Sequence, residues 1–127
     1  MSDQGIEIQM DEILKTFDVK LNAAVEKVTK QVAQETAKQL RSTSPKNTGE
    51  YASGWTVKKE PGEMGSTGYV VYNSKKPWRT HLLEFGHEKK NQHGSYGRVA
   101  AHPHIKPAEE AAKAKLESLL VDEINKG

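Results

Sequence analysis

Two short stretches constrain this chain more than any other feature. The first, residues 78–87, is its densest apolar and aromatic cluster, where Trp78, Leu82 and Phe85 recur at i, i+4 and i+7. That spacing predicts a short helix with one apolar face turned to the core. The second covers residues 102–108 and precedes a long helical pattern. A short core helix followed by a segment restricted by prolines favours a scaffold for assembly over a catalytic centre.

Proline and glycine also predict where these helices begin and end. Pro77 suits a first helical position, because its missing N–H would have no partner there. Gly86 suits the position just past a helix end, where φ is positive. Pro107 opens the last helix in the same way, and Glu109 and Glu110 lie where the helix dipole favours negative charge. The predicted buried side of this last helix consists of Ala108, Ala112, Leu116, Leu119, Leu120 and Ile124.

The N-terminal part has the pattern of an arm followed by a long helix. Ile6, Ile8 and Met10 alternate with polar residues, which predicts a short strand or an arm over residues 1–10. Asp11 is a suitable N-cap, and apolar residues then step by three and four to residue 41. A straight helix of that length spans roughly 45 Å, against a diameter near ~36 Å for a compact domain of this size. We therefore expect the helix to bend or to pack its end on something else.

In the middle of the chain, apolar and polar residues alternate as in the strands of a sheet. The residue before Pro45 is disfavoured in helical geometry, so the long helix should end there. Alternation predicts a strand over residues 51–59, and residues 69–72 form a second, β-branched and aromatic strand of an antiparallel hairpin. Residues 88–98 are polar and contain glycine, which predicts a mobile loop. Residues 99–102 are predicted to form a third strand.

Composition limits the classes of protein to consider. At 127 residues the chain is expected to be a single domain, and its hydrophobic fraction of 35% predicts a modest core that relies partly on neighbouring subunits. The absence of cysteine excludes a disulfide framework and a thiolate metal site. No segment resembles a signal peptide or reaches the ~18 apolar residues of a membrane helix. We expect a soluble protein of a cytoplasm-like compartment with no membrane contact.

The net charge of +2 is unevenly distributed. Residues 1–40 carry five Lys and seven Asp/Glu (−2), whereas residues 41–106 carry eleven Lys/Arg and five Glu (+6) and all five histidines. Residues 107–127 carry three Lys and five Asp/Glu (−2). A basic middle of this size can steer a partner or tolerate nearby DNA, but it is weaker than the basic face of a dedicated DNA-binding domain.

Four of the five histidines are candidate metal ligands by residue type. His81, Glu84 and His87 follow at i, i+3 and i+6, which differs from the i, i+4 histidine spacing of zinc hydrolase helices. We interpret His81 and Glu84 as residues of the polar or inter-subunit side of the short helix. His102 and His104 flank a proline and should share one face of a strand, but no third ligand lies nearby in sequence. Proline also confines a strand to an edge, where another chain can dock.

The motifs of common enzymes are missing. The chain has no nucleophile elbow, phosphate-binding loop or dinucleotide fingerprint, so we predict no catalytic residue, cofactor or metal. The alternative function is a small nucleic-acid-binding module, because pairs of lysines alternate with aromatic residues that can stack on bases. The simpler interpretation is that alternation places the aromatic residues inward and the lysines outward. The aromatic residues in question are Trp55, Tyr69, Tyr72, Trp78 and Tyr96.

The order of three short motifs resembles the small tail-component family of long-tailed bacteriophages. The motifs are Pro-x-x-Thr-Gly at 45–49, Leu-Glu-Phe-Gly-His at 83–87 and Pro-His-Ile-x-Pro-Ala at 103–108. The resemblance extends from the first long helix to the last. Members are described as neck, tail-completion or head–tail joining proteins, so the resemblance implies a non-enzymatic virion protein of a phage or prophage, made in the bacterial host cytoplasm.

The resemblance also implies a fold and an assembly. The fold is α+β, a small antiparallel sheet flanked by a long N-terminal helix and a C-terminal helix, with a short helix after the hairpin. The assembly is a homo-oligomeric ring, typically a hexamer, at the head–tail junction. Its implied partners are head-completion or connector proteins, tail-tube or tail-terminator proteins, and passing DNA.

A closed ring is heterologous, so one face of each subunit must fit a different face of the next. We expect the sheet edge and residues 88–98 to become ordered against neighbours, and the basic middle segment to face the lumen or a DNA-bearing partner. The candidate interface residues are Trp78, His81, Glu84, His87, Lys89, Lys90, Arg98, His102 and His104.

Overall fold

The computed structural model describes residues 5–17, 19–20, 22–46, 49–61 and 67–126. Within them, five helices combine with two small antiparallel sheets, which confirms the α+β class. The helices are α1 (Met10–Leu14), α2 (Ala23–Thr43), α3 (Glu50–Ser53), α4 (Arg79–Phe85) and α5 (Ile105–Lys126). The strands are β1 (Ile8–Gln9), β2 (Trp55–Pro61), β3 (Thr67–Asn73), β4 (His87–Asn91) and β5 (Gly94–Val99).

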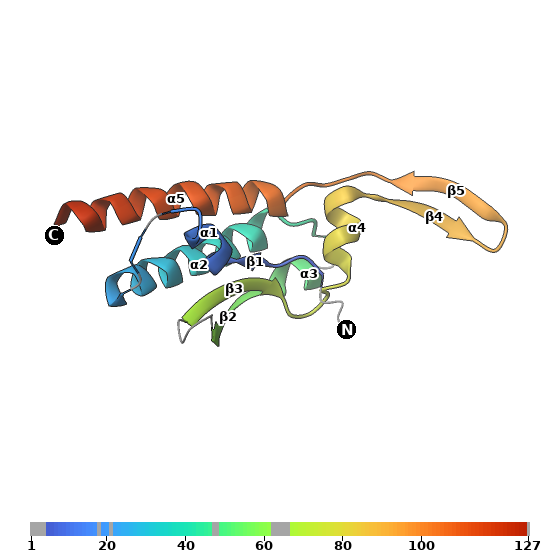
Figure 1. Cartoon of the computed structure of the whole chain (residues 1–127). Helices are drawn as coiled ribbons and strands as arrows, with labels where there is room; N and C mark the ends of the chain where they lie inside the picture. The colour runs from blue at the N-terminus through green and yellow to red at the C-terminus, as the bar shows by residue number, and fades with distance from the viewer. Residues whose placement is uncertain (1–4, 18, 21, 47–48, 62–66, 127) are drawn as a thin grey trace.

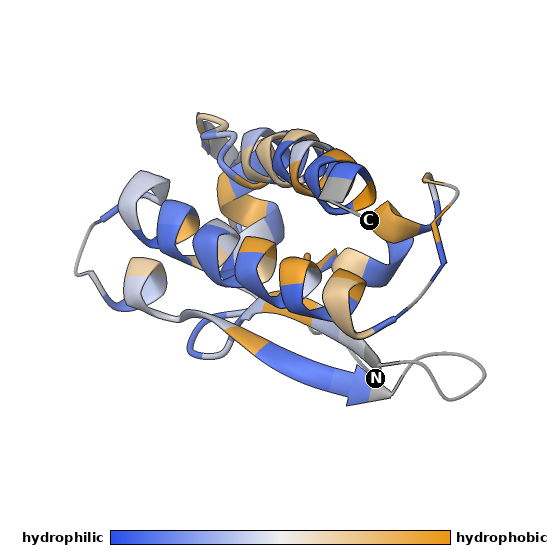
Figure 2. Ribbon diagram, turned by 90° about the vertical axis from the view of Figure 1, so that its left-hand side faces the viewer, coloured by the Kyte–Doolittle hydropathy of each residue, from blue (hydrophilic) through white to orange (hydrophobic). Residues whose placement is uncertain are grey.

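The body of the subunit has three layers. Helix α2 lies between α5 and a three-stranded sheet of order β1-β3-β2, as Figures 1 and 2 show from two sides. Both outer strands pair antiparallel with β3. Ile8 of β1 and Val57 of β2 are each paired with Val71 of β3, one from either side. The predicted hairpin of β2 and β3 is therefore confirmed, and so is a short strand within the N-terminal arm. The turn between β2 and β3 lies outside the described residues.

The predicted single helix over residues 11–41 is wrong. Helix α1 ends at Leu14, where the Thr16 hydroxyl donates to the Ile13 carbonyl at 2.7 Å. Helix α2 begins after Asn22, whose backbone is extended (φ −158°, ψ −179°) and whose Oδ1 accepts from the Val25 N–H at 2.9 Å. Asn22 is therefore the N-cap of α2. Apolar periodicity does not reveal a polar cap residue, so the sequence pattern predicted a continuous helix. The 21 residues of α2 span only ~31 Å, so the helix does not overhang its domain.

Other boundaries are partly correct. Ser44 is extended (φ −70°, ψ 150°) and ends α2 just before Pro45, as predicted. Gly86 has a φ of 75°, also as predicted. Gln9, rather than Asp11, occupies the N-cap position of α1. The predicted strand over residues 51–59 is wrong in its first part, because Tyr51 lies in α3. The last helix begins at Ile105, two positions before the predicted Pro107.

The stretch predicted as a loop, residues 88–98, is a β-hairpin. Strands β4 and β5 pair antiparallel from His87 opposite Val99 to Asn91 opposite Gly94, with an irregularity after Lys89. Figure 1 shows this hairpin projecting away from the body, at the opposite end from the C-terminus. Strand β5 ends at Val99, so the predicted strand over residues 99–102 is also wrong. The mobility of the segment stays a prediction.

Replacing Asn22 by Ala is expected to lower the free energy of unfolding by about 1 kcal/mol, because α2 loses its N-cap. Urea denaturation measures the change, and Asn22→Asp should retain most of the stability. In one continuous helix Asn22 would be an interior residue, and the alanine would stabilise the protein by up to about 0.7 kcal/mol. A gain in stability would therefore contradict the break between α1 and α2.

Candidate assembly site

Helix α4 turns Thr80 and Glu84 inward, beside the partly buried Leu83, and leaves several apolar side chains outside. Thr80 and Glu84 are buried, and Glu84 is only 5% exposed. Trp78 is 56%, Leu82 37% and Phe85 62% exposed. The predicted burial of the apolar face is therefore wrong, and so is the predicted position of Glu84 on the polar surface. The three exposed residues Trp78, Leu82 and Phe85 are called the α4 face below.

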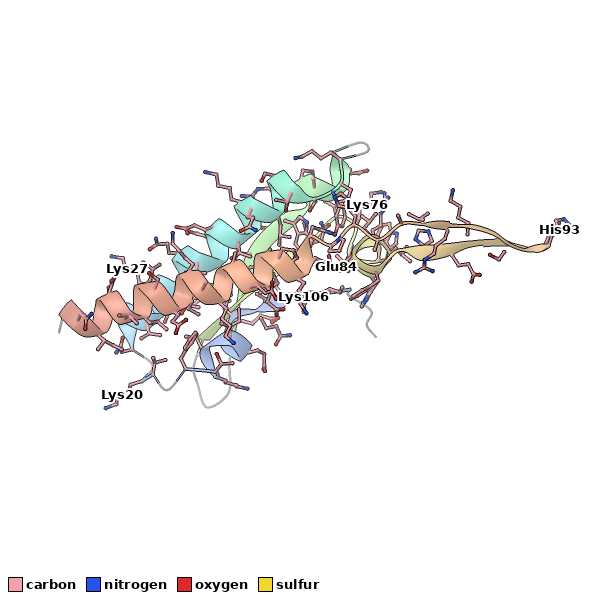
Figure 3. The ribbon with its side chains drawn as sticks, turned by 90° about the horizontal axis from the view of Figure 1, so that it is seen from above. Lys20, Lys27, Lys76, Glu84, His93 and Lys106 are labelled. Atoms are coloured by element: carbon pink, nitrogen blue, oxygen red, sulfur yellow. The ribbon has the colours of Figure 1, made fainter. Side chains whose placement is uncertain are left out.

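The Glu84 carboxylate caps the first turn of α5. Its Oε1 accepts the N–H groups of His104 and Ile105, both at 2.8 Å, and its Oε2 accepts the N–H of Lys106 at 3.0 Å. The first N–H groups of a helix have no partner within the helix, and the dipole there favours negative charge. Figure 3 shows Glu84 beside the beginning of α5, next to Lys106. A side chain of α4 thus fixes the position of α5.

The environment keeps Glu84 ionised. Burial raises the pKa of this carboxyl, but three backbone N–H donors and the nearby His104 outweigh burial, and the net pKa is lowered. Charge-assisted hydrogen bonds of this kind are about twice as strong as neutral ones. The contact between α4 and α5 is therefore an electrostatic link inside an otherwise apolar core.

His104 extends the link as a neutral imidazole. Its Nδ1 lies 2.7 Å from the His102 carbonyl oxygen, which only accepts, so Nδ1 carries the proton. Its Nε2 then accepts from the Tyr51 hydroxyl at 2.8 Å. Burial lowers the pKa of His104 despite the opposing effects of this hydrogen bond and of Glu84. The 3.1 Å contact between His104 Nδ1 and Glu84 is thus not an ion pair at neutral pH.

Aromatic rings carry the link to the end of α2. The Tyr51 ring meets those of Trp55 and His104 edge-on, with centroids 5.9 Å and 5.7 Å apart. Burial, followed by the charge of Glu84, raises the pKa of Tyr51, so its hydroxyl remains a donor. Trp55 Nε1 donates to Ser44 Oγ at 2.8 Å. We call Ser44, Tyr51, Trp55, Glu84 and His104 the Glu84 cluster.

Backbone contacts hold the chain on either side of α4. The His102 N–H donates to the Leu83 carbonyl at 2.8 Å. A Cβ at Gly86 would lie 2.6 Å from the Val99 carbonyl oxygen, so only glycine permits this approach. On the other side, Thr80 Oγ1 accepts from the Ile6 N–H at 2.7 Å, which ties the N-terminal arm to α4.

The remaining candidate residues are not brought into one site. His81 is exposed, and His87 is half-buried with its Nδ1 unpaired. Lys89 and Arg98 are exposed on the hairpin, whereas the side chain of Lys90 lies outside the described part. His102 is exposed and His104 buried, so the prediction that they share one face of a strand is wrong. The described residues contain no group of three or more His, Asp or Glu that could hold a metal ion.

Of the five aromatic residues proposed as a stacking platform for nucleic acid, two are buried, and the side chain of Tyr96 lies outside the described part. Trp55 and Tyr69 are buried, so their faces are not available to bases. Lys58 lies 4.6 Å from the half-buried Tyr72 ring, and Lys76 lies 5.4 Å from the ring of the exposed Trp78. None of the helices among the described residues combines the length and apolar character needed to cross a bilayer.

The family model described as "Bacteriophage HK97-gp10, putative tail-component" matches residues 8–86, well over half of the chain. No curated protein and no solved structure matches the chain. The chain therefore belongs to the HK97-gp10-like family of bacteriophage tail components, and it is a structural protein of a phage tail. The match ends at Gly86, so it includes α4 but not the β4–β5 hairpin or α5.

The Glu84 cluster contains residues from, or directly beside, each of the three sequence motifs. Ser44 and Tyr51 flank the first motif, Glu84 belongs to the second, and His104 belongs to the third. Sequence analysis missed Thr80 and Tyr51 as structural residues. Thr80 and Glu84, at i and i+4, were nevertheless visible as an alternative inward face of α4.

Replacing Glu84 by Ala is expected to destabilise the protein by about 3 kcal/mol or more, because three buried N–H groups lose their acceptor. Glu84→Gln should cost less, since one amide oxygen can still accept. The exposed Glu109→Gln in α5 is the control, with an expected change within about 0.5 kcal/mol. Equal effects of E84A and E109Q in urea denaturation would contradict the capping role.

Stability is expected to fall on acidification, because His104 and Glu84 both have lowered pKa values in the folded state. Each group contributes stability above its usual pKa, 6.5 and 4.5 respectively, and that stability is lost as the pH falls through the lower folded pKa. Thermal unfolding between about pH 7 and pH 5 should show the part of this loss that belongs to His104, and His104→Gln should flatten it. An unchanged pH dependence in H104Q would show that another group is responsible.

Proposed function

We propose that this tail protein acts at the head–tail junction, where copies of it assemble into a closed, sixfold ring that joins tail to head. The observation that supports the proposal best is the α4 face. A tryptophan, a leucine and a phenylalanine lie together on the outer side of a helix whose inner side is held by a buried carboxylate. Aromatic residues are enriched at the centres of protein interfaces.

The β4–β5 hairpin supports the same proposal. It is a two-stranded sheet that extends beyond the body (Figure 1). A single hairpin is marginally stable in water unless other strands or a helix cover it. Its setting suits a segment that becomes covered when subunits assemble.

The proposed partners are neighbouring copies of this chain, the head-completion or connector protein on one side, and the tail-tube or tail-terminator protein on the other. DNA passing through the lumen is proposed as a non-specific contact of the basic middle segment, residues 41–106, which carries a charge of +6. The proposal includes no chemical turnover. Its support is the membership of a tail-component family.

Particles made without this protein are expected to be separate DNA-filled heads and tails, as counted by electron microscopy. Supplying the wild-type protein should restore joined virions. Joined virions without the protein would contradict the proposal, and tails of altered length would place the protein elsewhere in the tail. Strong, steeply salt-dependent binding of DNA by the free protein would favour the alternative of a nucleic-acid-binding module.

Trp78→Ser and Phe85→Ser are expected to leave the melting temperature nearly unchanged, because both side chains are mostly exposed in the subunit. The same variants should fail to support joining of heads and tails. Leu116→Ala, in the core, is the contrasting control and should lower the free energy of unfolding by about 2–5 kcal/mol. If the double variant W78S/F85S joined heads and tails as well as the natural protein, the α4 face would not be an assembly surface.

A further inference from the structure

The subunit has uncovered apolar side chains at both ends. One set is the α4 face, and the other consists of Val121 and Ile124 in the last turns of α5, which are 49% and 67% exposed. The exposure of Ile124 contradicts its predicted place on the buried side of α5. Figure 1 shows the C-terminal end of α5 and the hairpin at opposite ends of the molecule.

The two ends also differ in charge. The hairpin, residues 87–99, carries Lys89, Lys90 and Arg98 against a single Glu88. The last turns of α5, residues 116–126, carry Glu117, Asp122 and Glu123 against a single Lys126. Opposite charges around two apolar surfaces steer them together and disfavour the pairing of like ends. The hairpin end of one copy is therefore complementary in charge to the C-terminal end of α5 of another copy.

One subunit cannot bring its own two ends together. The Glu84 cluster fixes α4 at the beginning of α5, and Ile124 lies 19 residues further along this helix, or roughly 29 Å away. In Figure 3 His93 at the tip of the hairpin and Lys27 near the far end of α2 lie at opposite ends of the molecule. The contact between the two surfaces must be between molecules.

We propose that the α4 face and the β4–β5 hairpin of one copy dock on the C-terminal turns of α5 of the next copy, around Val121 and Ile124. The inference rests on the proposed ring and names its repeating contact. The two surfaces differ, so the contact is heterologous, as a closed ring requires. Beside the same end of α5, a groove of about 480 Å³ offers additional room for a side chain of the neighbour, and its lining is mostly polar: Lys27, Val28, Gln31, Leu119, Asp122, Glu123 and Asn125.

Cysteine cross-linking tests this contact directly, because the natural chain has no cysteine. Phe85→Cys and Ile124→Cys are prepared separately, mixed and oxidised. The expected result is a disulfide-linked dimer in the mixture, no dimer from either variant alone, and a ladder of multimers from the double variant. Phe85→Cys mixed with Lys38→Cys, an exposed position in the C-terminal half of α2, is the control and should stay monomeric on a non-reducing gel.

Other outcomes overturn the inference. Dimers of Phe85→Cys alone would show that two α4 faces meet each other. The mass of the unmodified assembly in solution reports separately on the ring. A ring without the 85–124 cross-link would contradict this contact and leave the proposed function intact, whereas the absence of both assembly and cross-link would count against both.

Charge exchange supplies a second, independent readout. Lys89→Glu is expected to weaken assembly by up to about fivefold, the size of an exposed ion pair. Adding Asp122→Lys should restore it, because the two reversed charges then meet across each contact. Lys38→Glu is the matched control and should leave assembly unchanged. Failure of the second reversal to restore assembly would contradict the pairing of these two ends.

Discussion

The position of α4 depends on one buried carboxylate. Glu84 accepts three N–H groups from the first turn of α5, and it remains ionised because these donors outweigh the cost of burial. Glu84 therefore joins α4 directly to α5. The consequence is that Thr80 and Glu84 lie on the inner side of α4, beside the partly buried Leu83, and Trp78 and Phe85 are left on the outside.

The Glu84 cluster also explains why three distant motifs are needed by one structure. His104 passes the link to Tyr51, and the rings of Tyr51 and Trp55 continue it to Ser44 at the end of α2. A polar network in a low-dielectric core is stable only when its members are satisfied together. The short motifs therefore maintain the Glu84 cluster inside the protein, and the surfaces beside this cluster are available for assembly.

Local rules predicted much of the fold, and tertiary contacts explain what they missed. The β2–β3 hairpin, the extended Ser44 and the positive φ of Gly86 follow from alternation, proline and glycine. The orientation of α4 could not be predicted, because the apolar stripe and the Thr80–Glu84 pair offered opposite inward faces. The contacts that favour the polar face come from distant parts of the chain: the N–H groups at the start of α5, twenty residues later, and the Ile6 N–H that Thr80 accepts. Apolar periodicity predicts burial without distinguishing the subunit's core from an interface.

The central claim is that the α4 face is exposed in the free subunit and covered in the assembled tail. The chain has two tryptophans, of which Trp55 is buried and Trp78 exposed, so acrylamide reaches Trp78, and the free Trp78→Phe variant gives the background signal of Trp55. Acrylamide quenching of the natural chain, free and assembled, with this background subtracted, is the most direct measurement. We predict strong quenching in the free subunit and protection with a blue-shifted emission after assembly. Equal quenching in both states would contradict it.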